Sequence, residues 1–269
     1  MVRMKVSCIT VCYKTPDLIR NLLSGISRAH FSFPFEYFLI NNNPGDETST
    51  FVRAHFPWVT VIDAPRNIGF GAGHNLAFAR ATGEYLMLMN PDLTVFAGEM
   101  EKFLACADAH PEVGILGPRV LNPNRMIQRT FHRFHTPLIP VYRRTFLSRT
   151  FVGRRAISSF FMEDTDATLA QDVDGIFGAA MLIRARALQE IGFFDERFFM
   201  YFEDVDLCRR AWMNGWSVRY APIAEFVHYH QRESHVRHWW QAFGNPLSRA
   251  HVASAIKYFW KYYGKKLPR

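Results

Sequence analysis

The sequence predicts an α/β fold in which a mostly parallel sheet is covered by helices. Short apolar runs rich in β-branched residues alternate with segments of helical spacing through the first half of the chain. Such alternation predicts parallel strands, because each connecting helix returns the chain to the same edge of the sheet. The 269 residues are 49% hydrophobic and 21% charged, the composition of a folded protein with a substantial core.

The first half supplies these elements in order. The apolar run at 5–12 predicts the first strand, and Thr15-Pro16-Asp17 gives a cap, a first-position proline and an early acid for a helix to about Ala29. Further strands are expected at 35–40, 58–62, 85–89 and 113–116, and further helices through 51, over 77–81 and over 99–110. Polar loops follow the strands that end at Cys12, Ile40, Ile62 and Met89. Ligands of parallel sheets gather at such carboxyl ends, so these loops predict a binding site.

The second half is less regular. Strands are expected at 175–183, 216–220 and 225–229, with a helix at 186–191. Over about 122–172 arginines are interleaved with Phe and His, which indicates either a mobile insertion or a solvated loop. The aromatic and basic tail at 237–269 fits either a helix on a membrane surface or a helix docked on the domain. We therefore predict a domain at 1–236, with halves at 1–118 and 119–236, followed by the tail.

Charge and cysteine content indicate which classes of binding partner and which cellular compartment to expect. The formal charge is +8 and the pI is about 9.5, which favours nucleic acid, phospholipid headgroups or a phosphorylated small molecule. Cys8, Cys12, Cys106 and Cys208 show neither zinc spacing nor a CxxC pair, so we expect reduced thiols in the cytosol. No apolar run approaches the ~18 residues of a membrane span, and no signal peptide is expected.

The chemistry is expected in the stretch 198–210, where an aromatic run gives way to Glu203, Asp204 and Asp206. From Asp204 onward the spacing is helical, with Val205, Arg209 and Trp212 at three- and four-residue steps, until Asn214-Gly215 ends the pattern. The acids therefore lie at a helix start, where unpaired N–H groups and the helix dipole stabilise negative charge. An ionised carboxylate there suits a general base, and a simple capping role is the alternative.

The glycine loop at 67–75 (NIGFGAGHN) differs from a nicotinamide-binding fingerprint. Its spacing is G-x-G-x-G, it is separated from the preceding strand, and no acid follows at the required distance. Glycine here allows the backbone to approach a nucleotide or sugar closely, with Asn67 and Asn75 as hydrogen-bonding groups. The sequence also lacks the G-x-x-x-x-G-K-[ST] loop of an ATPase.

A metal site is predicted around Asp92. It follows an apolar strand in Asn90-Pro91-Asp92, and Mg²⁺ or Mn²⁺ bound to a diphosphate needs only one or two protein carboxylates. His228 and His230 lie on one face of the last predicted strand, and one neutral imidazole from this pair could complete the site. A turn-forming aspartate and structural histidines are the alternatives.

Together and in this order, the motifs resemble the inverting family 2 glycosyltransferases of GT-A fold, in particular their rhamnosyltransferase-like branch. The resemblance runs from about Lys5 to Ser234 and rests on the segments VSCITVCYKTPDLI, NIGFGAGHN, LMLMNPDL, GAAMLIRARAL and GFFDERFFMYFEDVDLCRRAW. It implies a mixed, mostly parallel sheet flanked by helices, with a nucleotide-sugar-binding half followed by an acceptor and catalytic half.

The resemblance also implies roles for individual residues. Asp204 would be the catalytic base, supported by Glu203, and a divalent Mg²⁺ or Mn²⁺ ion would be held by Asp92 and His228. The implied nucleotide-sugar contacts are Thr10, Cys12, Tyr13, Asn41, Asn67, Gly69, Asn75, Asn90, Asp92 and Arg232, and those on the acceptor side are Gly178, Ala179 and Phe202. Asn41 stands where the family usually has Asp, and Lys14 where Asn is frequent, so the nucleotide is less well defined than the reaction.

The implied reaction moves a sugar from a nucleoside diphosphate to a hydroxyl of a saccharide or lipid-linked acceptor, with inversion at the anomeric carbon. The resemblance favours L-rhamnose from dTDP-rhamnose in bacterial cell-surface polysaccharide synthesis, with UDP-sugars as alternative donors. A nucleotidyltransferase is disfavoured, because no loop rich in Gly and Arg follows the first strand. A non-catalytic basic module for membrane or nucleic acid would leave the acids idle, so no nucleic-acid partner is expected. We expect a cytoplasmic enzyme, peripheral on the inner membrane face through its tail.

Overall fold

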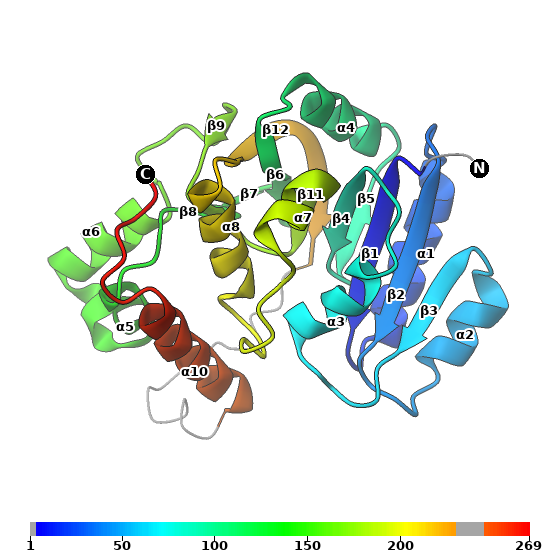
Figure 1. The fold of residues 1–269 in the computed structure, drawn as a ribbon, viewed down its shortest axis with the longest axis horizontal. Coiled ribbons are helices and arrows are strands. Elements are labelled where there is room, and N and C mark those ends of the chain that lie inside the picture. Colours follow the sequence, from blue (N-terminus) through cyan, green and yellow to red (C-terminus); the bar gives the residue numbers. More distant parts are fainter. Residues whose placement is uncertain (1–3, 230–244) are drawn as a thin grey trace.

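The computed structural model describes residues 4–229 and 245–269, and a ten-stranded sheet lies at its centre (Figure 1). Eight strands follow the order β3-β2-β1-β4-β11-β6-β12-β5, with β7 beside β6 and β9 beside β12. The sheet comprises β1 (Val6–Cys12), β2 (Phe35–Asn41), β3 (Val59–Asp63), β4 (Tyr85–Met89), β5 (Leu93–Val95), β6 (Val113–Leu121), β7 (Ile127–Gln128), β9 (Gln171–Asp172), β11 (Ala180–Arg184) and β12 (Ser217–His228). A separate small sheet pairs β8 (Phe131–His132) with β10 (Gly175–Ile176).

The sheet is parallel through its first half and mixed through its second. β1 pairs in parallel with β2 and β4, and β2 with β3. The register places Cys12 beside Asn41 and Asn41 beside Asp63, so three strands end at one edge. β11 runs antiparallel between β4 and β6, while β12 runs parallel to β6 and antiparallel to β5. This arrangement confirms the predicted mixed, mostly parallel sheet with flanking helices.

Helices cover both faces of the sheet. They are α1 (Pro16–Ala29), α2 (Thr48–His55), α3 (Phe70–Phe78), α4 (Glu99–Ala109), α5 (Leu138–Arg144), the 3₁₀ turn η1 (Phe146–Arg149), α6 (Phe151–Phe160), α7 (Ala185–Ile191), α8 (Glu203–Met213) and α10 (Pro246–Lys261). One core lies between the sheet and α1, α2 and α4, and the other between the sheet and α3, α7 and α8. Neighbouring strand residues such as Met87 and Leu88 enter opposite cores, as strand geometry requires.

Two sequence predictions of strands were wrong in detail. The strand predicted at 175–183 is two strands, because the backbone at 177–179 leaves the ladder to bond with Asp204 and Asn90 instead. The strands predicted at 216–220 and 225–229 are one, β12, whose register against β6 shifts between Ala221 and Glu225. Pro222, which has no N–H for the ladder, lies in that shift.

The weakly patterned segment at 122–172 contains three helical pieces, α5, η1 and α6, besides short strands (Figure 1). Of its helical pieces, η1 and α6 begin at side-chain caps: the Thr150 hydroxyl accepts a hydrogen bond from the Gly153 N–H at 3.0 Å at the start of α6. Arg129 donates to the carbonyl oxygens of Met162 and Thr165, at 2.5 and 3.1 Å. These hydrogen bonds join the beginning of the segment to its end.

The described part of the tail docks on the domain. Ala255, Tyr258 and Tyr262 pack with Phe202 and Val205 in a third apolar cluster. The Asn245 side chain caps α10, accepting from the Leu247 N–H at 2.9 Å. Among the described residues, no helix combines the length and the apolar character needed to cross a bilayer. Helix α10 therefore has the docked arrangement, one of the two that the sequence left open for the tail. Residues 237–244 of the tail lie outside the described part of the chain.

Candidate active site

The turn before α8 holds two residues in the left-handed region of backbone space. Tyr201 and Phe202 both have φ of 69°, a conformation that residues with a Cβ rarely adopt. Aromatic contacts hold this turn: the Tyr201 and Phe202 rings lie 5.0 and 5.3 Å from the His251 ring on α10. The Ser254 hydroxyl donates to the Met200 carbonyl oxygen at 2.9 Å. The turn therefore fixes where α8 begins, and α10 supports it.

Asp204 in the first turn of α8 is half-buried and held by backbone donors. Its Oδ2 accepts from the Gly178 N–H at 2.9 Å, and its Oδ1 from the Val205 N–H at 2.8 Å. Burial raises the pKa of Asp204, and these hydrogen bonds offset part of that rise. A carboxylate with an elevated pKa and fixed orientation is suited to accept a proton at neutral pH.

Glu203 differs from its neighbour in burial and in hydrogen bonding. The side chain is buried, and its Oε2 has no hydrogen-bond partner among the described residues. Burial, and then the negative charge of Asp204, raise the pKa of Glu203 well above its ordinary value. Glu203 is therefore the group of this pair that holds its proton more tightly, which leaves Asp204 as the candidate base.

The loop at 177–179 connects this acid pair to the loop after β4. The Gly178 N–H reaches Asp204, and the next residue, Ala179, accepts from the Asn90 N–H through its carbonyl oxygen at 2.9 Å. A Cβ at Gly178 would lie 3.2 Å from the Phe70 ring, so the close approach favours glycine. Of the residues predicted on the acceptor side, Gly178 contacts the candidate base directly, Ala179 follows it in the chain, and the buried Phe202 lies two residues before Asp204.

Asp92 and His228, the predicted metal ligands, lie together. Antiparallel pairing of β5 with β12 puts Leu93 opposite His228, and the His228 Nε2 is 3.1 Å from Asp92 Oδ1. The Nδ1 atom of His228 lies 2.8 Å from Gln128 Oε1, a contact that orients the ring. Gln128 was missed from the sequence, because it lies in a two-residue strand 100 positions before His228.

The donor set around Asp92 suits a cation that a ligand helps to bind. Among the described residues, no three His, Cys, Asp or Glu side chains cluster as a metal site. One carboxylate oxygen and one imidazole nitrogen fit Mg²⁺ or Mn²⁺ only if phosphate oxygens and water complete the coordination. Arg232 and His230, which were predicted near this site, lie outside the described residues.

Three predicted nucleotide contacts at the ends of β1 and β2 are buried. The Thr10 hydroxyl lies 2.7 Å from the Tyr37 hydroxyl, and the Cys12 thiol lies 3.9 Å from Asn41 Oδ1. Asn41 donates to Asp46 and to Ser49 at 3.1 and 3.0 Å. These buried side chains contact other protein groups at the strand ends, whereas the neighbouring Tyr13 is exposed at the edge of the sheet.

The glycine loop packs against the turn before α8. Gly69 has a φ of 93°, and a Cβ there would collide with the Phe199 carbonyl oxygen, to which the Phe70 N–H donates at 2.9 Å. Asn67 Oδ1 accepts from the Gly69 N–H at 3.0 Å. The Asn75 amide exchanges hydrogen bonds with the backbone of Phe194, each at 3.0 Å. The loop therefore positions the turn before α8, while its nucleotide contacts stay a prediction.

Asp46 and Asp63, which sequence analysis did not single out, complete the polar edge at β2 and β3. Burial opposes ionisation of both, but hydrogen bonds from Asn43 to Asp46 and from Ser49 and Arg53 to Asp63 leave each pKa below its ordinary value. Little in the sequence indicates a role for these two residues, because aspartates in turns and at strand ends are common.

Comparison with known proteins agrees with this geometry. A family model described as glycosyltransferase like family 2 matches residues 4–245. The N-acetylglucosaminyl-diphospho-decaprenol L-rhamnosyltransferase of Mycobacterium tuberculosis is 25% identical over 240 residues, covering 82% of this chain and 75% of that protein. The rhamnosyltransferase WbbL of Escherichia coli is 24% identical over 203 residues, covering 71% and 69% of the two chains.

Solved structures share the fold. GalNAc-T7, crystallised with UDP, GalNAc and Mn²⁺, superimposes with a TM-score of 0.66 at 14% identity, over 97% of this chain and 48% of that one. The mannosyltransferase PcManGT of Pyrobaculum calidifontis, in complex with GDP-Man and Mn²⁺, gives 0.59 at 16% identity over 99% and 67%. The S. aureus enzyme TarS gives 0.58 at 17% identity, and the match spans only 37% of TarS. This chain belongs to the family 2 glycosyltransferases and has the GT-A fold.

Proposed function

We propose that this enzyme transfers L-rhamnose from dTDP-rhamnose to a hydroxyl of a saccharide or lipid-linked acceptor, with inversion, in bacterial cell-surface polysaccharide synthesis. The relatives named as rhamnosyltransferases support the sugar, and the decaprenol-linked substrate in one name supports a lipid-linked acceptor. A UDP-sugar is the second candidate donor, supported by the fold shared with proteins crystallised with UDP or UDP-GlcNAc.

The observation that carries the proposal is the bridge at 177–179. It ties the Asp204 carboxylate to the loop after β4 by two hydrogen bonds of 2.9 Å. An inverting transfer needs a base on one side of the anomeric carbon and support for the leaving diphosphate on the other. Asp204 and Asp92 supply groups of these two kinds, and the bridge keeps their separation fixed.

Asp204 would take the proton of the attacking acceptor hydroxyl as the new glycosidic bond forms. Its two backbone hydrogen bonds orient the carboxylate, and the raised pKa improves its match to the proton that it accepts. Burial and the charge of Asp204 raise the pKa of Glu203, which favours its neutral form and so limits the negative charge at the site. One in-line attack inverts the anomeric centre, so no covalent intermediate on the protein is required.

Asp92 and His228 would hold the diphosphate end of the donor. A divalent Mg²⁺ or Mn²⁺ ion bound there supplies positive charge that stabilises the leaving group. The His228 ring, oriented by Gln128, is fixed close to the Asp92 carboxylate. Arg232 would add a further positive charge from outside the described residues.

We place the enzyme in the cytoplasm, peripheral on the inner face of the membrane. The tail supports a surface contact, since Ile256 and Trp260 on α10 and Tyr263 just after it are 65, 82 and 85% exposed. The tail at 237–269 would make this contact, and no nucleic-acid partner is proposed.

The test is calorimetric binding and thermal stability with dTDP-rhamnose, UDP-glucose, UDP-galactose and UDP-N-acetylglucosamine, each with and without Mn²⁺. A ligand that binds only the native state raises its stability by mass action. Selective, Mn²⁺-dependent stabilisation by dTDP-rhamnose is expected. Selective binding of a UDP-sugar would replace the proposed donor, and silence from all four donors would contradict the proposed function.

A further inference from the structure

The insertion formed by α5, η1 and α6 carries the most exposed phenylalanines of the described chain. Phe146 and Phe151 are 75 and 77% exposed, and Val152 next to them is 63% exposed. Other exposed phenylalanines, such as Phe96 and Phe199, reach only 43 and 40%. Single exposed apolar residues are ordinary, but these three large exposed apolar side chains all lie within positions 146–152 of the insertion.

The same segment is basic and free of acids. Between Glu112 and Glu163 the sequence contains no Asp or Glu, but it has arginine at positions 119, 125, 129, 133, 143, 144, 149, 154 and 155. Arg129 and Arg133 contact groups within the insertion, whereas Arg149, Arg154 and Arg155 are exposed beside the phenylalanines. No carboxylate among the described residues forms an ion pair with these last three arginines, although the Arg154 guanidinium donates to the Arg149 carbonyl oxygen at 2.8 Å. Their positive charges therefore remain available at the surface.

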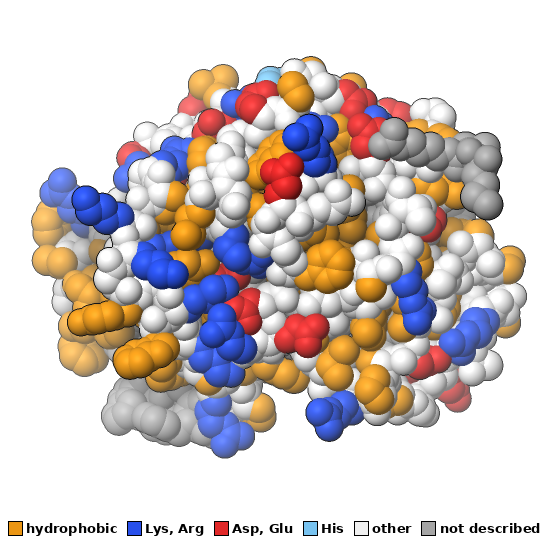
Figure 2. All heavy atoms as spheres, viewed as in Figure 1, with side chains coloured by type: hydrophobic (Ala, Val, Ile, Leu, Met, Phe, Trp, Pro, Cys, Tyr) orange, Lys and Arg blue, Asp and Glu red, His pale blue; other side chains and the backbone are white. Residues whose placement is uncertain are grey.

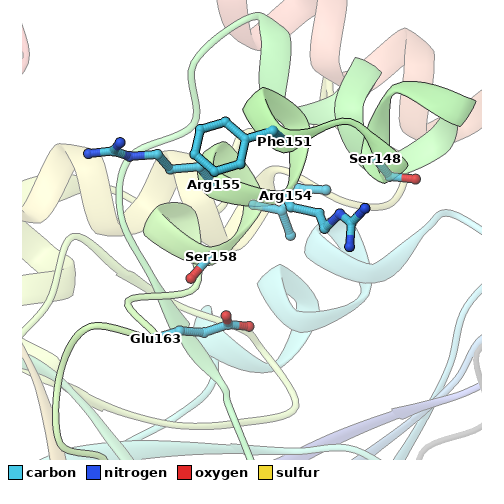
Figure 3. Close-up of a pocket in the computed structure, with 7 residues that line it drawn as sticks. Ser148, Phe151, Arg154, Arg155, Ser158 and Glu163 are labelled. Carbon is cyan, nitrogen blue, oxygen red and sulfur yellow. The ribbon is translucent and has the colours of Figure 1, made fainter.

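A pocket of about 700 Å³ lies between η1 and α6. Its lining includes Ser148, Ser158, Arg154, Arg155 and the acidic Glu163, with the Phe151 ring at its edge (Figure 3). Figure 3 shows the two arginines extending in opposite directions from α6, with Phe151 between them. Because the two guanidinium groups diverge and Glu163 shares the lining, the pocket is not a cradle for a single phosphate. The surface around it instead presents separate positive charges beside an apolar ring, a combination that suits the interface of an anionic bilayer.

We propose that the α5–η1–α6 insertion is a docking surface for an anionic phospholipid bilayer. Phe146, Phe151 and Val152 enter the interface between headgroups and acyl chains, and the outward arginines contact headgroup phosphates. Combined apolar and basic character distinguishes this surface from a polyanion-binding one, because nucleic acid phosphate needs the arginines but gains little from bare phenylalanine and valine.

The position of the insertion connects this surface to the catalytic turn. Phe160 at the end of α6 lies 4.5 Å from the His135 ring, which lies 4.8 Å from Phe202. Phe202 in turn contacts His251 on α10 at 5.3 Å. Hydrophobic and basic side chains gather on the side of the molecule formed by α5, α6 and α10 (Figures 1 and 2). Binding through the insertion would therefore hold the acceptor side of the site near the bilayer.

The inference goes beyond the proposed function, since vesicle binding requires no sugar transfer. The test is flotation of the full chain with vesicles of phosphatidylcholine alone and of phosphatidylcholine with phosphatidylglycerol. The wild type should float with the anionic vesicles and less with the neutral ones. The pair Arg154→Gln and Arg155→Gln should weaken anionic binding by about fivefold for each arginine removed. The pair Phe146→Ser and Phe151→Ser should weaken binding to both vesicles, because apolar insertion contributes at either surface.

Matched controls change the same residue types elsewhere. Arg28→Gln with Arg80→Gln removes two exposed charges, and Met213→Ser with Ile223→Ser removes two exposed apolar side chains. Both control pairs should float like the wild type. Circular dichroism and transfer to a water-soluble acceptor check that each variant is folded and active, which separates failure of this inference from failure of the proposed reaction.

Several outcomes would overturn the proposal. One is equal flotation of the insertion variants and the wild type. Another is loss of binding only on Trp260→Ser with Tyr263→Ser, which would assign membrane contact to the C-terminal tail alone. A third is salt-sensitive binding of single-stranded RNA with no vesicle binding, which would replace the bilayer by a nucleic acid.

Discussion

The edge of the sheet carries two acidic clusters that differ in the direction of their pKa shifts. At the ends of β2 and β3, hydrogen bonds outweigh burial and lower the pKa of Asp46 and Asp63. At the start of α8, burial dominates and raises the pKa of Glu203 and Asp204. Carboxylates whose hydrogen bonds outweigh burial stabilise a loop, whereas carboxylates whose burial outweighs their hydrogen bonds are better suited to exchange protons. The contrast separates a cluster that shapes the site from the one that we expect to perform chemistry.

The two clusters also differ in how the fold holds them. The β2–β3 cluster is local, with Asn41, Asp46 and Ser49 bonded to one another within nine positions of sequence. The α8 cluster depends on distant segments, since the left-handed turn at Tyr201 and Phe202 is packed by α10. Changes in α10 should therefore affect catalysis, while changes at β2 should affect mainly the local fold.

The largest effect is expected from Asp204→Asn, which removes the proposed base but keeps the shape of the side chain. Transfer should fall by at least 10²–10⁴-fold, the usual contribution of general base catalysis. Binding of dTDP-rhamnose, measured by calorimetry, should remain near the wild-type value. The raised pKa of Asp204 further predicts that the wild-type rate falls as the pH drops through a value above the ordinary aspartate pKa.

Asp17→Asn is the matched control, because it makes the same change at an exposed position of α1. It should leave both the rate and its pH dependence unchanged. A wild-type rate in pure Asp204→Asn protein would show that Asp204 is not the base. The acidic cluster at the start of α8 would then no longer be distinguished from the β2–β3 cluster by its chemistry.

The next effect is on stability, and it tests how α10 supports α8. Asp206 is fully buried and accepts from Tyr262 at 2.9 Å and from Arg210 at 2.8 Å, with Lys261 at 2.6 Å. Asp206→Asn should lower the free energy of unfolding by about 3 kcal/mol, because two cations lose a buried partner. Urea unfolding measures the loss.

Tyr262→Phe gives the graded comparison, since it removes one hydrogen bond to Asp206 and keeps the ion pairs. A smaller loss of about 1 kcal/mol is expected. Equal stability of Asp206→Asn and the wild type would show that α10 is not fastened to α8 through this carboxylate.

Asn41→Asp introduces the acid that the family usually has at this position. Its loss of stability should be smaller than that of Asp206→Asn. Asn41 donates to Asp46 at 3.1 Å, so an aspartate would replace an attraction with a repulsion between carboxylates. We expect a loss of about 2 kcal/mol in urea unfolding. Asn124→Asp, which adds the same charge at an exposed turn, should change stability little. An unaltered or more stable Asn41→Asp protein would contradict the view that this cluster is fixed by local hydrogen bonds.

Much of this organisation could be predicted from the sequence, and the remainder depends on contacts between distant segments. The alternation of apolar runs and helical spacing predicted the parallel half, and the ordered motifs predicted the family. Periodicity could not reveal β5, which is only three residues long, or the departure of residues 177–179 from the ladder. The helices of the insertion were missed because their exposed apolar residues, such as Phe146 and Phe151, hide the usual helical pattern.

The site shows the same division. Asp204 and Glu203 were predicted from an abrupt change in residue type, and the closeness of Asp92 and His228 was expected from family resemblance. The left-handed φ of Tyr201 and Phe202 had no sequence signal, because neither residue is a glycine or an asparagine. Gln128 and α10 reach the site only through tertiary packing, which a linear pattern does not encode.

The smallest expected effect is the pH dependence of stability that Glu203 causes, and it tests the contrast between the two acidic clusters. Because the pKa of Glu203 in the folded protein lies above that in the unfolded chain, its neutral form stabilises the fold and ionisation at higher pH removes that advantage. The wild type should therefore lose stability, relative to Glu203→Gln, as the pH rises from the ordinary glutamate pKa towards the raised folded value. At low pH the two proteins should differ by less than about 1 kcal/mol, since both side chains are then uncharged. Thermal unfolding across pH measures the difference, and a wild type that gains stability over Glu203→Gln as the pH rises would mean that Glu203 is held ionised, like Asp46 and Asp63.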